Sequence, residues 1–328
     1  MAADRTSKKA KDLAKKEYQT FDYYPLISNE TDDRYLLDGW NACIATDASG
    51  DPLYWLKATG KGTEESMIVI LKQSIALRYP GATLGTFRRN NILLSDTKTL
   101  PLTWSLDSLT EIGNIDLVRE VQDHQQRSSE HTREQIHVNV SLREMYEEGL
   151  LEEGRILNAL SLPCNTSHSG HPLQSIISSH IQAFEQTSDL PMDVYTSGYP
   201  VSATSFWLVA TKGAISYIHS DCFGVGTVVE VLCGRKLWYV FQRHRTVGNR
   251  QDSYINEYMG DWAPGFIPDP EDWTSEVVLL EPGSAFYMHP DTHHAVVTLE
   301  NSIVKGHHFY STATLSKTVL GSWRFSFV

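Results

Sequence analysis

Hydrophobic and polar residues follow different patterns in the two halves of the chain. From residue 205 onward, short runs of Val, Ile, Tyr, Phe and Trp are separated by Gly, Pro and Asp. Runs of this length and composition, with turn residues between them, are typical of β-strands. The predicted strands are 206–211, 215–219, 227–232, 237–241, 277–280, 285–288, 295–299 and 302–309. Their spacing favours an antiparallel barrel or sandwich.

The half before residue 205 combines helical and strand-like patterns. Apolar residues within 67–77 recur at mixed helical spacing, which predicts a helix there. Residues 137–140 have the composition of a strand, and Ser141 with Glu144 matches the capping-box pattern that begins a short helix. An apolar stripe over 173–184 predicts another helix. We therefore expect a mixed first half that leads into a β-barrel.

A polar stretch marks the predicted boundary between these parts. Residues 121–135 are polar throughout and predict a surface linker or an exposed helix. The expected organisation is an α+β chain with a basic flexible tail over 1–20, a mixed α/β region over 21–135 and a C-terminal domain over 136–328. The barrel core of that domain is expected at about 205–310.

Composition and charge exclude several classes of protein. The chain has 328 residues, 41% hydrophobic and 21% charged, as expected of a globular protein. The net charge of −12 argues against a protein that coats nucleic acid. No run of eighteen apolar residues occurs, so we expect no membrane span. The 4 cysteines contain no C-x-x-C pair, which argues against a disulfide framework, a zinc finger and an iron–sulfur cluster.

The first twenty residues bear on location. They lack an apolar stretch of signal-peptide length and contain several lysines. Such a segment is either a solvated, frayed helix or a basic nuclear-import patch. We therefore expect an intracellular protein, nuclear if the patch is functional and cytoplasmic otherwise.

Histidine is the residue type that most suggests chemistry, because seven of the 13 histidines follow Ser216. His219 and Asp221 are two residues apart at the end of a predicted strand, so their side chains can share one face. An imidazole and a carboxylate on one face supply two ligands of the 2-His-1-carboxylate site typical of non-haem Fe(II). The similar pair His289 and Asp291 has a proline between its members, which predicts a turn instead.

Further candidates lie on neighbouring predicted strands. His293 and His294 precede a strand, and either can supply the third ligand. Lys236 lies on a predicted hairpin over 227–241. A lysine inside an apolar barrel is costly unless it meets an anion, such as a co-substrate carboxylate; the alternative is a lysine at the rim beside the turn. The last predicted strand carries His307 and His308, and one of them can face the interior.

The ordered set of these motifs resembles the Jumonji C (JmjC) domain. This family has the cupin-type double-stranded β-helix, or jelly-roll barrel, of Fe(II)- and 2-oxoglutarate-dependent oxygenases. About half of the chain takes part in the resemblance, which is closest to the histone-lysine demethylase branch. The similar stretches are 147–163 (EEGLLEEGRILNALSLP), 217–221 (YIHSD), 229–241 (VEVLCGRKLWYVF), 281–288 (EPGSAFYM) and 293–310 (HHAVVTLENSIVKGHHFY).

The resemblance implies a role for individual residues. His219, Asp221 and His294 resemble the three iron ligands. Lys236 resembles the residue that binds the distal carboxylate of 2-oxoglutarate, and Ser216 matches a position that often contacts the same carboxylate.

One departure keeps a second ligand set open. The family usually has an aromatic pair before the distal histidine, whereas this chain has Thr292 and His293. His293 therefore remains a rival to His294 for the third ligand position.

The resemblance implies an oxygenase that uses Fe(II), 2-oxoglutarate and dioxygen. The leading expectation is demethylation of methyl-lysine in a protein or peptide, such as a basic histone tail, with no direct binding of nucleic acid. One alternative is a hydroxylase that acts on a side-chain carbon of a protein. The other is a catalytically silent cupin-like scaffold that binds a partner.

Overall fold

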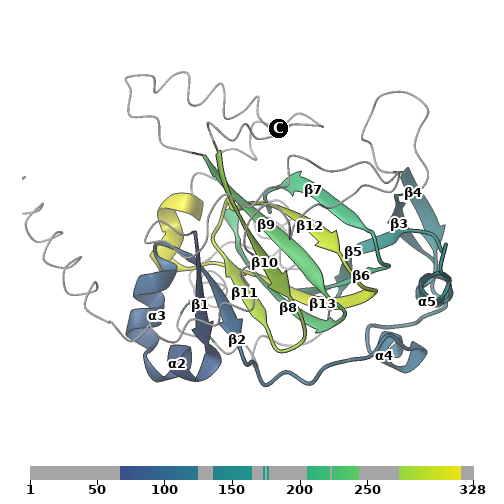
Figure 1. The fold of residues 1–328 in the computed structure, drawn as a ribbon, viewed down its shortest axis with the longest axis horizontal. Coiled ribbons are helices and arrows are strands. Elements are labelled where there is room, and N and C mark those ends of the chain that lie inside the picture. Colours follow the sequence, from purple (N-terminus) through teal and green to yellow (C-terminus); the bar gives the residue numbers. More distant parts are fainter. Residues whose placement is uncertain are drawn as a thin grey trace, which may run out of the picture.

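The computed structural model describes residues 67–124, 136–164, 173, 176, 205–221, 224–243 and 273–318 (Figure 1). These residues are mostly in β-strands. The strands are β1 (Ile68–Lys72), β2 (Asn91–Ser95), β3 (Arg119–Asp123), β4 (Ile136–Val140), β5 (Leu157–Pro163), β6 (Ser205–Ala210), β7 (Ile215–His219), β8 (Gly226–Cys233), β9 (Lys236–Arg243), β10 (Trp273–Leu280), β11 (Ala285–Met288), β12 (His293–Thr298) and β13 (Ser302–Phe309).

Helices are short; residues 315–318 are helical after the last strand, and the other helices lie among the earlier strands. They are α2 (Gln73–Arg78), α3 (Pro80–Phe87), α4 (Leu106–Thr110) and α5 (Leu142–Leu150), and a 3₁₀ turn spans Thr312–Thr314. The helix α5 begins at the capping box predicted from the sequence: Glu144 N–H donates to the Ser141 hydroxyl at 3.2 Å, and Ser141 N–H donates to the Glu144 carboxylate at 2.6 Å. No helix in the described ranges is long and apolar enough to cross a membrane.

The described strands form two sheets. One has nine strands in the order β1-β2-β11-β8-β13-β6-β5-β3-β4, and the other has four in the order β10-β9-β12-β7. The pair β1–β2 is parallel and the other pairs are antiparallel. Such an arrangement, mostly β with few helices, is compatible with a β-sandwich.

A shared core joins the two sheets. Figure 1 shows β9, β10 and β12 lying across β8, β11 and β13. The main cluster of buried side chains takes Val229 and Phe286 from the larger sheet and Trp238 and Val296 from the smaller one. Side chains alternate along a strand, so every second residue of β9 and β12 points into this interior.

The eight strands predicted beyond residue 205 are confirmed, but the connection between β8 and β9 is not a hairpin. β8 pairs with β11 and β13, whereas β9 pairs with β10 and β12. The chain changes sheet at Gly234, whose φ of 75° is easily reached only by glycine. A Cβ there would also collide with the backbone of Asn301. Lys236 therefore begins a strand of the smaller sheet.

Two predictions for the first half are wrong in part. The segment predicted as a helix over 67–77 begins with β1, and only α2 is helical. β1 is rich in β-branched residues and pairs with β2. The predicted linker over 121–135 begins inside β3, where Val121 and Asp123 are buried.

The expected boundary at residue 135 does not interrupt the sheet. β3 and β4 lie on either side of it and pair with each other, and β1 and β2 join the same sheet through β11. The predicted tail over 1–20, most of the predicted helix over 173–184, and His244 lie outside the described residues.

Replacing Gly306 with alanine should destabilise the fold. Gly306 lies in β13, and a Cβ there would collide with the ring of Phe206. Overpacking of this kind costs about 1–3 kcal/mol. Gly81→Ala is the matched control, because nothing lies within 4 Å of its Cβ position in α3. Urea denaturation should show a lower free energy of unfolding for Gly306→Ala alone, and equal losses in both variants would contradict this packing.

Candidate metal centre

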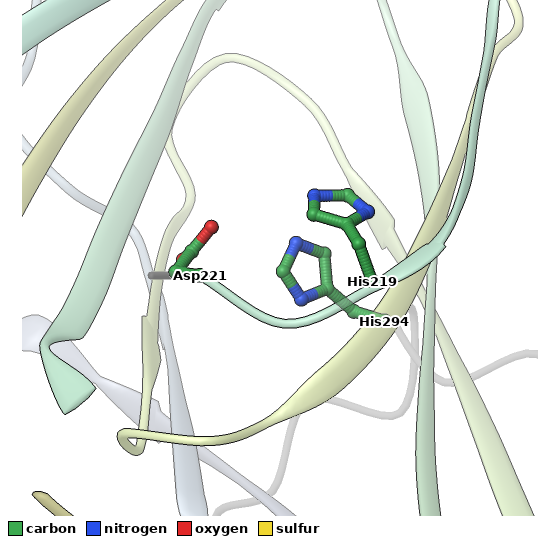
Figure 2. Close-up of side chains that lie close together, drawn as sticks. All are labelled: His219, Asp221 and His294. Carbon is green, nitrogen blue, oxygen red and sulfur yellow. The ribbon is translucent and has the colours of Figure 1, made fainter. Parts of the chain in front are cut away.

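Strand pairing brings three potential metal ligands together. β12 lies between β7 and β9, and its register places His294 opposite His219 on β7. Asp221 follows two residues after the end of β7. One ligand atom from each of these residues lies within 4.8 Å of the other two. Figure 2 shows the carboxylate of Asp221 and the two imidazoles facing a common point.

Backbone hydrogen bonds select the ring nitrogen that each imidazole presents. His219 Nδ1 lies 2.6 Å from the carbonyl oxygen of Tyr217, and His294 Nδ1 lies 2.9 Å from that of Thr292. A carbonyl only accepts, so each Nδ1 carries the proton and donates it. The lone pair is then on Nε2, which is the usual arrangement of a metal-binding histidine.

The electrostatics keep His294 and Asp221 in the protonation states that a metal requires. Burial, together with the charge of His219, lowers the pKa of His294 to about 4, so the ring is neutral near pH 7. Burial opposes ionisation of Asp221, but His294, His308 and His219 outweigh it and lower the pKa of the carboxyl. A neutral imidazole and an ionised carboxylate bind cations without first losing protons.

A second layer of side chains orients Asp221. The hydroxyl of Thr227, on β8, donates a hydrogen bond to the Asp221 carboxylate. Thr227 Oγ1 also lies 2.9 Å from Nδ1 of His308, on β13. Since the hydroxyl proton goes to Asp221, the threonine oxygen accepts from His308. Thr227 and His308, both in the larger sheet, thus orient Asp221, which follows β7 of the smaller sheet.

His293 is not part of the cluster. It neighbours His294 on β12 and therefore points to the opposite face. There it packs edge-on against Trp273, with ring centroids 5.9 Å apart. His294 instead stacks against Trp238, with ring centroids 5.4 Å apart and planes 15° apart. Of the two histidines left open by the sequence, the structure brings His294 to the other ligands.

His289 and Asp291 lie in a turn, as predicted. The turn follows β11, and Asp291 has a φ of 61°. His289 is buried away from the cluster. Its ring packs against Phe87, and its backbone N–H donates to Asn91 Oδ1 at 2.8 Å. The same H-x-D spacing therefore occurs in two settings. His219 and Asp221 are potential metal ligands at the end of a strand, whereas His289 and Asp291 lie in a turn.

Lys236 lies inside the fold rather than at its rim. Its side chain is 4% exposed, and Nζ donates to Thr298 Oγ1 at 3.1 Å. Burial lowers the pKa of Lys236 to about 7, with no carboxylate opposing the shift. An ammonium group has three donors, and within the described ranges only Thr298 accepts from this one. The site therefore has unused capacity for an anion.

Ser216, the other residue expected at the co-substrate, lies close to Asn158. Its hydroxyl is 3.5 Å from Asn158 Nδ2, and the same amide group donates to Gln122 Oε1 at 2.9 Å. Ser216 pairs in register with Val296, two residues from Thr298. It thus occupies the same region of the smaller sheet as the Lys236–Thr298 contact.

The site combines a nitrogen–nitrogen–oxygen ligand set with a separate buried cation. Two imidazoles and one carboxylate fit the ligand pattern of non-haem Fe(II) sites, although zinc and other transition metals also accept such donors. Thr227 is the member of the site that the sequence analysis missed. A threonine opposite His308 carries no motif, and only strand register reveals it. No protein-family model and no curated protein matches the chain.

Removing His294 should abolish tight metal binding, whereas removing His293 should not. His294→Ala deletes one ligand of three, so Mn(II) affinity should fall roughly 100-fold or more. His293→Ala is the matched control from the opposite face of β12. Calorimetric titration with Mn(II) measures both, and a greater loss for His293→Ala would transfer the ligand role to His293.

Thr227→Val should weaken metal binding by about tenfold while leaving the ligands in place. The variant keeps the side-chain shape and deletes the hydroxyl that orients Asp221. Thr227→Ser, which keeps the hydroxyl, should retain the wild-type Mn(II) affinity. If Thr227→Val binds Mn(II) as tightly as the wild type, Thr227 has no positioning role.

Proposed function

We propose that the protein is an Fe(II)- and 2-oxoglutarate-dependent oxygenase of the JmjC type. The observation that carries the proposal is a buried lysine, with no acidic partner among the described residues, on the same face of the smaller sheet as a His–Asp–His cluster. A metal cluster alone is compatible with many functions. The buried ammonium group of Lys236 favours the binding of a small anionic molecule that contacts both the metal and the lysine.

Strand order supports a jelly-roll core for this proposal. From β6 to β13 the chain passes between the sheets at nearly every connection, and only β9 and β10 are successive strands in one sheet. The larger sheet contains the order β11-β8-β13-β6, and the smaller has β10-β9-β12-β7. Each sheet thus interleaves early and late strands, as expected when a long antiparallel pair winds into a double-stranded β-helix.

Residues of the chain itself would hold the metal and the co-substrate. His219, Asp221 and His294 would bind the iron through Nε2, a carboxylate oxygen and Nε2. Three protein ligands leave positions on one side for other molecules. Iron with 2-oxoglutarate and dioxygen supplies oxidation of an unactivated C–H bond. The protein supplies the geometry of the ligands: His294 is buried against the ring of Trp238, whereas His219 is exposed at the end of β7.

Lys236 is suitably placed for the far carboxylate of the co-substrate. Lys236 pairs with Thr298, which lies four residues from His294 on the same face of β12. Four residues of strand span about 13 Å. Lys236 Nζ lies at the Thr298 end of this interval, and a metal-bound molecule would extend toward it from the His294 end. A carboxylate there would form charge-assisted hydrogen bonds with donors that Thr298 does not use.

The proposed substrate is a methylated lysine of a protein, with a basic histone tail as the leading candidate. The net charge of −12 favours a basic peptide over a nucleic acid. Hydroxylation of an N-methyl group gives an unstable product that loses formaldehyde, whereas hydroxylation of a carbon gives a stable alcohol. Nuclear location belongs to the same proposal and depends on the lysine-rich first twenty residues.

Peptide products test the reaction directly. Purified protein with Fe(II), ascorbate and 2-oxoglutarate should release formaldehyde from methyl-lysine histone peptides, with one methyl group lost per formaldehyde. Unmethylated peptides serve as the control. A gain of one oxygen on an unmethylated peptide would replace demethylation by side-chain hydroxylation. No 2-oxoglutarate-dependent product from either set would favour a binding scaffold.

Lys236→Met should make the empty protein more stable and unable to respond to 2-oxoglutarate. Replacing a buried, unpaired charge with a similar apolar side chain gains about 1–4 kcal/mol. The lowered pKa means that the unfolded chain binds more protons between pH 7 and 10.5. Wild-type stability therefore rises over this interval, and the advantage of Lys236→Met is greatest below pH 7.

Thermal denaturation measures both effects. With Mn(II) present, 2-oxoglutarate should raise the melting temperature of the wild type and leave that of Lys236→Met unchanged. An equal rise in both proteins would exclude Lys236 from co-substrate binding.

A further inference from the structure

His124 lies near Lys236, although 112 residues separate them in the sequence (236 − 124). Its backbone N–H follows β3 and donates to the carbonyl of Ile156 at 2.9 Å. The side chain of Ile156 lies against Gly213, whose N–H donates to the carbonyl of Thr298 at 2.9 Å. Thr298 is the residue that accepts from Lys236 Nζ. A continuous series of contacts therefore leads from His124 to Lys236.

The side chain of His124 is half-buried, and one of its ring nitrogens is enclosed. Its Nε2 is inaccessible to solvent and has no hydrogen-bond partner within the described part of the chain. Burial lowers the pKa of His124 to about 4; the charge of Asp123 opposes this shift and that of Lys236 adds to it. The two basic groups are thus close enough to repel each other when both are protonated.

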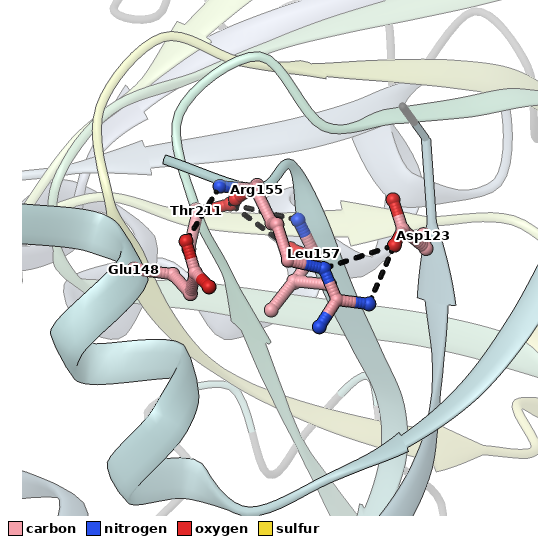
Figure 3. Close-up of polar contacts among 5 residues, drawn as sticks. All are labelled: Asp123, Glu148, Arg155, Leu157 and Thr211. Carbon is pink, nitrogen blue, oxygen red and sulfur yellow. Dashed lines mark hydrogen bonds and ion pairs between the residues drawn. The ribbon is translucent and has the colours of Figure 1, made fainter. Parts of the chain in front are cut away.

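The acidic neighbour of His124 is already paired. Asp123 is fully buried, and its Oδ2 accepts from Arg155 Nη2 at 2.6 Å and from Nε at 3.1 Å (Figure 3). Glu148 accepts from the backbone N–H of Arg155, so the arginine is fixed on the other side as well. Within the described ranges, the charges that act on His124 are those of Asp123 and Lys236, and Asp123 is itself paired with Arg155. Asp123 favours a positive charge on His124, but burial outweighs it and Lys236 adds to the effect of burial.

The strand that leads into His124 also reaches the hydrogen bonds of Ser216. Gln122 lies in β3 two residues before His124, and the backbone N–H of His124 continues the pairing with the β5 segment by donating to Ile156. Gln122 accepts from the amide of Asn158, which also contacts Ser216. Ser216 is thus connected through Asn158 to β3, the strand that leads into His124.

We propose that His124 is a second cationic group of the anion site at Lys236, so that a dicarboxylate binds there together with a proton taken up by His124. The inference rests on the proposed function, because 2-oxoglutarate supplies the carboxylate. In the empty site His124 stays neutral, since Lys236 and burial both oppose its charge. A bound carboxylate reverses this balance: it accepts a hydrogen bond from Nε2–H, and the incoming proton offsets its negative charge. His124 would thereby make co-substrate affinity depend on pH.

Measurements at two pH values distinguish proton uptake by His124 from proton uptake by Lys236. At pH 6 Lys236 is already mostly protonated, because its pKa is about 7. Proton uptake on binding at pH 6 then reports His124, whereas uptake at pH 8 includes Lys236. Calorimetric titrations in buffers of different ionisation enthalpy measure the number of protons taken up. The probes are 2-oxoglutarate with Mn(II), and glutarate alone, which lacks the keto group needed for chelation.

The test compares wild type, His124→Gln and His137→Gln. His137 is exposed on the adjacent strand β4, opposite Gln122, and serves as the matched control. At pH 6 the wild type and the control should take up roughly half a proton or more per ligand, and His124→Gln close to none. The affinity of His124→Gln for either probe should be about tenfold lower at pH 6. At pH 8 all three proteins should still take up protons through Lys236.

Each outcome decides between the inference and the proposed function. Binding of 2-oxoglutarate with the same affinity and proton uptake in His124→Gln and wild type at pH 6 would overturn the inference alone. If both probes bind in a way that depends on His124, but Mn(II) does not raise the affinity for 2-oxoglutarate, the inference stands and the proposed function is overturned. Failure of the wild type to bind either probe would overturn both. A thermal melt of His124→Gln that matches the wild type shows that the variant is folded.

Discussion

The pairing of β12 with β7 on one side and β9 on the other is the constraint on which the site depends. It sets His294 opposite His219 and Thr298 opposite Lys236, so the metal cluster and the buried lysine share one interior face. A shift of one residue would turn His293 inward and His294 outward, because side chains alternate along a strand. The alternation also places apolar residues of β12 in two separate buried clusters, so packing on both faces opposes such a shift.

Buried charges in this protein differ in how they are compensated. The carboxylate of Asp123 is paired with Arg155, and that of Glu276 accepts backbone N–H groups of Met67 and Ile68 at 3.0 and 3.1 Å. Lys236 has a single hydroxyl acceptor among the described residues. An uncompensated buried charge lowers stability, and such a cost is common at binding sites, where the ligand supplies the missing partner.

Much of the half beyond residue 205 is predictable from sequence, because its strands are short, apolar and separated by turn residues. The site residues His219, Asp221, His294 and Lys236 follow from strand ends and alternation together with the family resemblance. The choice between His294 and His293 required the register of β12. Local pattern was misleading at 67–72, where pairing with β2 prevailed over helical spacing.

Other features depend on contacts between distant segments. Nothing in the sequence near Gly234 distinguishes a hairpin from a change of sheet, because the pairing partners of β8 and β9 lie elsewhere in the chain. His124 lies in a polar stretch that resembles a linker, and only the pairing of β3 with β5 brings it toward Lys236. The role of Thr227 likewise depends on pairing between β8 and β13.

The most direct test of the central claim is the formation of succinate from 2-oxoglutarate by purified protein with Fe(II) and ascorbate, before any peptide is added. If the His–Asp–His cluster and Lys236 form one oxygenase site, the wild type should form succinate slowly in an Fe(II)-dependent reaction, and Asp221→Ala should form none while remaining folded. Equal succinate formation by the wild type and Asp221→Ala, or none by a wild type that binds both Fe(II) and 2-oxoglutarate, would contradict the claim.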